Sequence, residues 1–224
     1  WKRMTNFQKR FLSSLLLIPI ALFFIIKGSY FFNFFISICL LISIYEWHLV
    51  SKNKKYKIPG IIFLILSFYT AYYLRNEMYG FYYMYFLMFL FICIFTDIGG
   101  YIFGKLFKGP KLTSLSPKKT YAGVFGGYLF SIIFMSSFFN YADYIYEITN
   151  IKSTAKELSK NNFILTIIIS TVSQLGDIII SYFKRKSKIK DTGKIIPGHG
   201  GLLDRIDGMI FAFPVAYLIV KFLY

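Results

Sequence analysis

The sequence predicts an all-α integral membrane protein, a polytopic bundle of about seven transmembrane helices with its N-terminus in the cytoplasm. Two observations support this prediction. Of the 224 residues, 56% are hydrophobic and 21% are aromatic, which is more apolar surface than a soluble domain of this length can bury. The lysines and arginines, which give a formal net charge of +16, lie mostly in short segments between long apolar runs.

Seven apolar runs define the expected spans, because a helix of about 20 apolar residues crosses a bilayer. Basic residues precede the first run, but no small-residue cleavage site follows it, so we interpret this run as a retained helix and not as a signal peptide. The first and third runs are short for a span. Residues 141–161 are expected to form an external loop. The expected spans are residues 11–26, 29–50, 58–74, 79–104, 121–140, 162–183 and 201–223.

The distribution of basic residues predicts the orientation of these spans. With the N-terminus in the cytoplasm, 20 of the 26 lysines and arginines fall on the cytoplasmic side, as the positive-inside rule requires. The same charge suits phosphate-rich ligands or anionic lipid headgroups. A nucleic-acid partner is not expected, because the basic residues are confined to short loops between apolar spans.

Four of the ten carboxylates lie at or near membrane depth. Asp97 and Asp177 fall inside apolar spans, and Asp204 and Asp207 fall at the start of the last span. A charged group at this depth is costly and usually faces a polar cavity or a partner. One such residue is explained equally well by a structural ion pair. Four of them near the cytoplasmic ends of three helices favour a functional site.

Helical spacing groups these carboxylates. Asp204 and Asp207 are three residues apart and share one face of a helix. If Asp177, Asp204 and Asp207 lie close together, their negative charges repel one another unless a cation neutralises them. Mg²⁺ suits this arrangement, because it prefers carboxylate oxygens together with substrate phosphates. Four polar residues of the sixth span lie on one face at helical spacing: Ser173, Asp177, Ser181 and Lys184.

A basic segment and a glycine cluster separate Asp177 from Asp204. Residues 184–191 (KRKSKIKD) are typical of a solvated loop that sets topology. Gly198, Gly200 and Gly201 favour a second interpretation, because glycine lets the backbone approach an anion and present N–H groups to it. His199 lies among these glycines, but a single histidine makes no zinc site.

These residues carry a resemblance to a known family. Residues 181–185 (SYFKR), 190–191 (KD) and 197–207 (PGHGGLLDRID) resemble the signature of phosphatidate cytidylyltransferases, also called CDP-diacylglycerol synthases, over 27 residues without a gap. Residues 97–105 (DIGGYIFGK) and 115–123 (LSPKKTYAG) resemble an earlier block of that family, with one departure at Ala122, where relatives commonly carry an acidic or amide residue. The clear resemblance covers about residues 90–207. We therefore divide the chain into N-terminal transmembrane helices (1–89) and a catalytic transmembrane region (90–224) within one structural unit.

The resemblance implies that the protein converts CTP and phosphatidic acid to CDP-diacylglycerol and pyrophosphate, in phospholipid biosynthesis. It implies a multi-pass protein of the cell inner (cytoplasmic) membrane whose active site faces the cytoplasm. By similarity, Asp177, Asp204 and Asp207 hold Mg²⁺, with a second, monovalent cation such as K⁺, while Lys184 and Arg205 neutralise phosphate oxygens. The other residues expected at the substrates are Ser116, Lys118, Lys119, Thr120, Ser181, Arg185, Lys190, Asp191, His199, Gly200 and Gly201.

Other interpretations stay open at this point. A CTP-dependent lipid kinase of related architecture would transfer the γ-phosphate instead. A transporter would place polar residues through the whole bilayer, often in repeated halves, whereas here they gather at one side. The glycine pairs Gly100–Gly104 and Gly123–Gly127 predict close helix packing within or between subunits, which includes a homodimer.

Overall fold

The computed structural model describes residues 6–76, 82–113, 116, 119–149, 162–198 and 200–223. These residues form α-helices joined by loops, with two isolated β-bridges in the loops and no strand among them. The predicted all-α fold is confirmed. The helices are α1 (Asn6–Lys27), α2 (Ser29–Val50), α3 (Lys57–Asn76), α4 (Tyr82–Phe107), α5 (Tyr121–Thr149), α7 (Asn162–Lys186), α8 (Leu203–Ile206) and α9 (Met209–Leu223).

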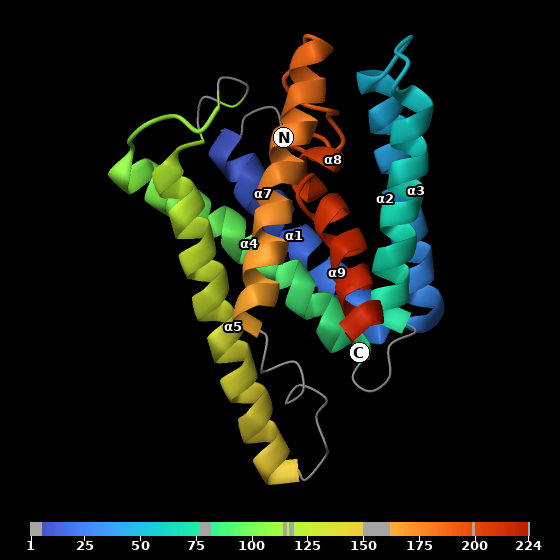
Figure 1. The fold of residues 1–224 in the computed structure, drawn as a ribbon. Helices are drawn as coiled ribbons and strands as arrows, with labels where there is room; N and C mark the ends of the chain where they lie inside the picture. Colours follow the sequence, from blue (N-terminus) through green and yellow to red (C-terminus); the bar gives the residue numbers. More distant parts are fainter. Residues whose placement is uncertain are drawn as a thin grey trace.

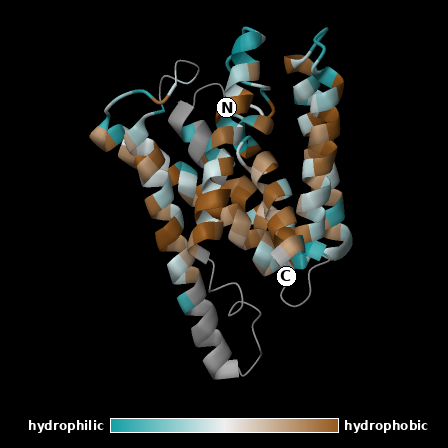
Figure 2. Ribbon diagram, in the orientation of Figure 1, coloured by the Kyte–Doolittle hydropathy of each residue, from teal (hydrophilic) through white to brown (hydrophobic). Residues whose placement is uncertain are grey.

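Five of these helices are long and apolar enough to cross a membrane: α2, α3, α4, α5 and α7. Helices α1 and α9 contribute shorter apolar stretches, Leu15–Lys27 and Met209–Phe222. At about 1.5 Å per residue, α9 is about 22 Å long, shorter than the roughly 30 Å hydrocarbon core. The hydrophobic residues form a broad middle band of the bundle, with hydrophilic residues at its upper end (Figure 2).

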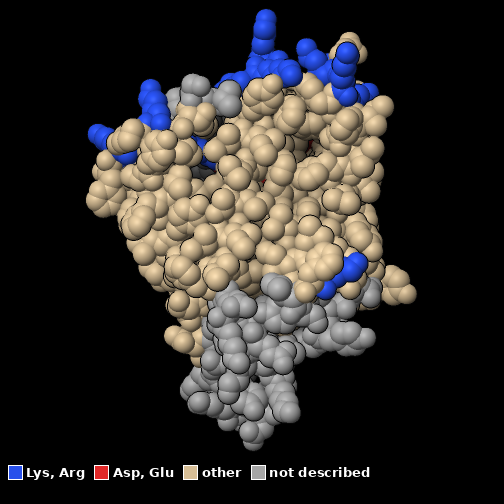
Figure 3. All heavy atoms as spheres, in the orientation of Figure 1, with Lys and Arg blue, Asp and Glu red and all other residues tan. Residues whose placement is uncertain are grey.

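Successive helices run in opposite directions, so alternate loops lie at the same end of the bundle (Figure 1). The start of α1, the α2–α3 turn, the α4–α5 loop and the end of α7 share one end, which we call the polar end. On the face drawn in Figure 3, nearly all visible lysine and arginine side chains gather at this end. The arrangement agrees with the alternation of sides expected from the basic residues.

The structure corrects the last expected span, 201–223, which is not one continuous helix. Helix α8 ends at Ile206, and α9 begins at Met209. The Asp207 carboxylate accepts the N–H of Gly208 at 3.1 Å, a local bond that competes with the helical pattern. Gly208 also packs so closely on Ser173 of α7 that a Cβ would collide with the Ser173 hydroxyl. Asp204 therefore lies on α8, whereas Asp207 lies in the break that follows it.

Two other expected boundaries are also wrong. Helix α5 continues to Thr149, so residues 141–149 of the expected external loop are helical, which fits a segment that contains neither glycine nor proline. The other residues of that loop, 150–161, lie outside the described residues. Helix α7 continues to Lys186 and includes the first part of the expected basic loop, because basic side chains stabilise the C-terminal end of a helix.

Glycines set the contact between α4 and α5. A Cβ at Gly99 would collide with the Gly126 carbonyl oxygen, and a Cβ at Gly123 would lie 2.8 Å from the Gly100 carbonyl oxygen. The expected close packing is thus found within the chain.

An apolar cluster lies beneath the polar end, where Trp47 of α2, Ile180 of α7 and Leu203 of α8 are all buried. This cluster joins the N-terminal helices to the segment that carries the signature.

Candidate active site

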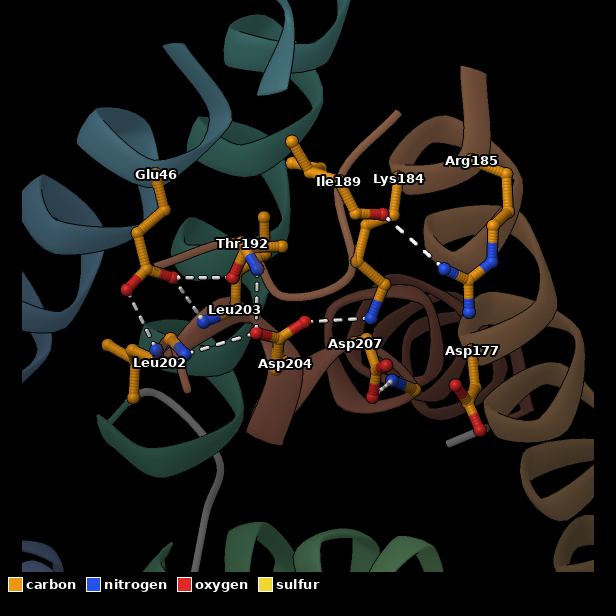
Figure 4. Close-up of polar contacts among 12 residues, drawn as sticks. Glu46, Asp177, Lys184, Arg185, Ile189, Thr192, Leu202, Leu203, Asp204 and Asp207 are labelled. Carbon is orange, nitrogen blue, oxygen red and sulfur yellow. Dashed lines mark hydrogen bonds and ion pairs between the residues drawn. The ribbon is translucent and has the colours of Figure 1, made fainter. Parts of the chain in front are cut away.

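Two carboxylates meet where α7 passes the break between α8 and α9. Asp177 lies on α7, and Asp207 lies in the break, where it is only 9% exposed. The two side chains lie next to each other in Figure 4, and Asp97 on α4 is a third acid close enough to interact with them. Asp207 is buried beside the Asp177 carboxylate, so two groups of like charge lie close together with little solvent to screen them. This crowding of like charges favours a bound cation.

Lys119 brings positive charge to the same place from the α4–α5 loop. Its ammonium group forms an ion pair with Asp177 and lies 3.4 Å from the Gln174 carbonyl oxygen. The loop holds Lys119 in place, because the Leu112 N–H donates to the Lys119 carbonyl at 2.8 Å. Thr120 lies immediately before α5, where its hydroxyl accepts the N–H of Gly123 at 3.1 Å and caps the helix.

A cavity of about 240 Å³ opens beside this group, between α4, α5 and α7. Asp97, Lys119, Thr120, Gln174 and Asp177 are among the residues that line it. The wall therefore combines a cation, two carboxylates, a hydroxyl group and an amide. This mixture suits a small anionic group that arrives with a cation.

Asp204 occupies a separate position. Its Oδ1 pairs with the Lys184 ammonium group at 2.7 Å, and its Oδ2 accepts the N–H groups of Thr192 at 2.7 Å and Gly201 at 3.0 Å. The Asp204 side chain is 5% exposed. In Figure 4, Lys184 reaches down between Asp204 on one side and Asp207 and Asp177 on the other. Asp204 therefore joins the loop between α7 and α8 to Lys184.

A second buried carboxylate holds the same loop from the other side. Glu46 of α2 is fully buried, and its Oε1 accepts the N–H of Leu202 at 2.9 Å. Its Oε2 accepts the N–H of Leu203 at 2.8 Å and the Thr192 hydroxyl at 3.0 Å. Figure 4 shows Glu46 and Asp204 on either side of Thr192.

The donor set at α7 and the break fits Mg²⁺. Among the described residues, no group of three or more His, Cys, Asp or Glu side chains is close enough to hold a metal ion. Mg²⁺ does not need such a group, since it commonly takes one or two carboxylates together with substrate phosphates and water. Asp177 and Asp207 would supply that pair, and their ligand role stays a prediction. A ligand role for Asp204 stays a prediction, and its oxygens already have the three partners described above.

The structure places the other predicted residues around these two centres. Ser181 is buried on α7, and Arg205 is exposed on α8, where its charge acts on Asp97. A Cβ at Gly201 would lie 2.5 Å from Glu46 Oε2, so a larger residue there would displace the Glu46 carboxylate. Gly200 has a φ of +90°, a backbone conformation that favours glycine.

Lys118 and His199 lie outside the described residues. Arg185, Lys190 and Asp191 are exposed at the polar end, and Ser116 is half-buried in the α4–α5 loop.

Sequence reasoning missed Glu46 and Thr192 as parts of the site, and it noted Asp97 without assigning it a role. The available signal for Glu46 was its position as the only acid in the apolar run of residues 29–50. Thr192 carried no signal, because a threonine in a loop has no preferred partner that its neighbours reveal.

Comparison with known proteins assigns the chain to a family. The sequence profile of the cytidylyltransferase family matches residues 68–223. A phosphatidate cytidylyltransferase from Rickettsia felis is 33% identical over 223 residues, which cover 96% of this chain and 92% of the relative. A protein of the same name from Rickettsia bellii is 32% identical over 97% of this chain and 92% of the relative. One from Staphylococcus saprophyticus is 33% identical over 78% of this chain and 64% of the relative. The resemblance inferred from the signature is confirmed, and the chain belongs to the cytidylyltransferase family.

Proposed function

We propose that this protein is a phosphatidate cytidylyltransferase, a multi-pass enzyme that makes CDP-diacylglycerol and pyrophosphate from CTP and phosphatidic acid. The observation that carries the proposal is the Asp177–Asp207 pair, with Lys119 beside it, in a chain that belongs to the cytidylyltransferase family. Both substrates are anionic, so the reaction needs cationic groups that reduce their repulsion. The basic polar end of the bundle suits this need.

In the proposed reaction, a phosphate oxygen of phosphatidic acid forms a bond to the α-phosphorus of CTP. The bond from this phosphorus to the oxygen that leads to the β-phosphate breaks, and pyrophosphate leaves. Asp177 and Asp207 would hold Mg²⁺, which when bound would neutralise phosphate charge. Lys184, Lys119 and Arg205 would attract and orient phosphate oxygens, and Asp204 would keep the Lys184 ammonium group in place.

The decisive experiment follows the phosphorus atoms of CTP. Purified protein is incubated with phosphatidic acid, Mg²⁺ and CTP labelled at the α-phosphate or the γ-phosphate. We expect the α-label in the lipid and the γ-label in pyrophosphate. A γ-label in the lipid would instead identify a CTP-dependent lipid kinase. Omitting Mg²⁺ is expected to stop the reaction, and adding K⁺ tests whether a monovalent cation contributes.

We further propose that the polar end faces the cytoplasm and that the membrane is the inner one. Lys54 in the α2–α3 turn and Lys27 at the end of α1 are both exposed and lie at opposite ends of the bundle. Lys54→Cys and Lys27→Cys are made separately after Cys39 and Cys93 have been replaced by alanine. A membrane-impermeant thiol reagent added outside intact cells should modify the Lys27→Cys variant only. Modification of the Lys54→Cys variant alone would mean that the topology is inverted.

Arg205 is expected to bind a phosphate group of a substrate and not merely to anchor the helix at the membrane interface. Its guanidinium group offers two parallel N–H donors, a geometry that an ammonium group lacks. Arg205→Lys is therefore expected to lower kcat/KM about tenfold, equal to about 1.4 kcal/mol, with the Mg²⁺ requirement unchanged. Kinetics against CTP and phosphatidic acid separately identify the substrate involved. Wild-type values for both substrates would support the interface anchor instead.

A further inference from the structure

We propose that Glu46 is a positioning residue of the active site, which acts through residues 192–203 to hold Asp204 against Lys184. We call the described residues of this segment, 192–198 and 200–203, the signature loop, and its last residue is the first of α8. Glu46 lies in the N-terminal helices, outside the segment that resembles the family signature. The inference deepens the proposed function and rests on it for its kinetic readout.

The first argument is the hydrogen-bond inventory of Glu46. Its carboxylate is fully buried, and its two oxygens receive three donors, all from the signature loop. The N–H groups of Leu202 and Leu203 can only donate, so both oxygens of residue 46 must accept. A carboxylate meets this demand, whereas an amide of the same shape presents an NH₂ group to one of the two donors.

The second argument is that Thr192 connects Glu46 directly to Asp204. The Thr192 hydroxyl donates to Glu46 Oε2 at 3.0 Å, and the N–H of the same residue donates to Asp204 Oδ2 at 2.7 Å. Asp204 in turn pairs with Lys184 at 2.7 Å. One residue thus separates the two buried carboxylates, and a shift of Thr192 would move the acceptor that fixes the Lys184 ammonium group.

The third argument is steric. A Cβ at Gly193 would lie 2.5 Å from Glu46 Oε1, and a Cβ at Gly201 would lie 2.5 Å from Glu46 Oε2. The signature loop therefore packs so closely on Glu46 that a Cβ at either position would displace the Glu46 carboxylate. This packing explains part of the glycine content of the loop without a direct substrate contact.

The test compares Glu46→Gln with Ser43→Ala as a matched control. Ser43 is also fully buried on α2, one turn before Glu46, but its hydroxyl donates only to the Cys39 carbonyl of its own helix, at 2.7 Å. In Glu46→Gln we expect the KM for CTP to rise about tenfold, because loss of one acceptor loosens the loop that orients Lys184. The KM for phosphatidic acid and the Mg²⁺ half-saturation should stay within about twofold. Ser43→Ala should behave as the wild type.

The KM is the informative quantity, because a smaller folded fraction lowers the apparent kcat and leaves both KM values unchanged. Hydrogen exchange without substrate supplies a readout that is independent of any reaction. The amides of Thr192, Leu202 and Leu203 should exchange at least about tenfold faster in Glu46→Gln than in Ser43→Ala. A wild-type KM for CTP together with wild-type exchange would overturn the proposal.

Thr192→Val provides a second route if Glu46→Gln yields no folded protein. This variant keeps Glu46 and the N–H bond to Asp204 but loses the hydroxyl, so we expect a rise of about threefold in the KM for CTP. Thr192→Ser should restore the wild-type value. If Thr192→Val shows a wild-type KM and wild-type exchange, the positioning role is rejected. If the wild-type protein makes no CDP-lipid, the proposed function fails, and the exchange comparison still decides the role of Glu46.

Discussion

Asp177→Asn is expected to lower kcat/KM by about 10³-fold or more, equal to roughly 4 kcal/mol, while the protein still inserts and folds. Asp177 is 28% exposed in the structure and combines three contacts of the proposed site: Asp207, Lys119 and the cavity wall. An asparagine keeps the shape but removes the negative charge that would attract Mg²⁺. Activity should recover only partly at high Mg²⁺ concentration, because the remaining carboxylate holds the ion less tightly.

The control for this prediction is Thr171→Val on the same helix. The Thr171 hydroxyl bonds to Tyr128 at 2.9 Å and to the Ile167 carbonyl at 2.7 Å, away from the carboxylates. This variant should keep wild-type turnover and Mg²⁺ dependence. Asp207→Asn should resemble Asp177→Asn, since both carboxylates belong to one pair. Near-normal turnover in either Asn variant would refute the assignment of the metal pair.

Asp204→Asn is expected to lower both activity and stability. The Asp204 carboxylate accepts two N–H groups of the signature loop and pairs with Lys184, and its side chain is 5% exposed. Breaking one partner of a buried pair costs about 3 kcal/mol, so the melting temperature in detergent should fall. We expect kcat/KM to drop about 100-fold, because Lys184 loses the group that orients it.

The Mg²⁺ half-saturation of Asp204→Asn separates two roles for this residue. If Asp204 organises the loop and Lys184, the half-saturation should match the wild type even though turnover is low. A large increase, similar to that of Asp177→Asn, would establish Asp204 as a metal ligand, as the family resemblance implies.

Much of the fold could be predicted from sequence because membrane helices satisfy their own backbone hydrogen bonds. The lengths of the apolar runs therefore located the long helices among the described residues. The side predicted to hold most basic residues matches the polar end of the bundle. Prediction failed where a local contact decides a boundary. The break at Asp207 and Gly208 depends on a carboxylate that bonds to the next N–H and on close contact with Ser173 of α7. A hydropathy pattern contains neither contact.

The sequence by itself determined the class of protein, the family and most of the acidic and basic residues of the candidate site, with Glu46 as the exception. Only the tertiary structure decided which of these charged side chains contact one another. Asp177 and Asp207 form one pair, whereas Asp204 faces Lys184 and Thr192. Glu46 lies 146 residues from Thr192 in the chain and reaches it only because α2 packs beneath the signature loop. The physical reason is that the role of a buried carboxylate depends on which hydrogen-bond donors surround it. Segments that are distant in sequence supply those donors only when the chain is folded.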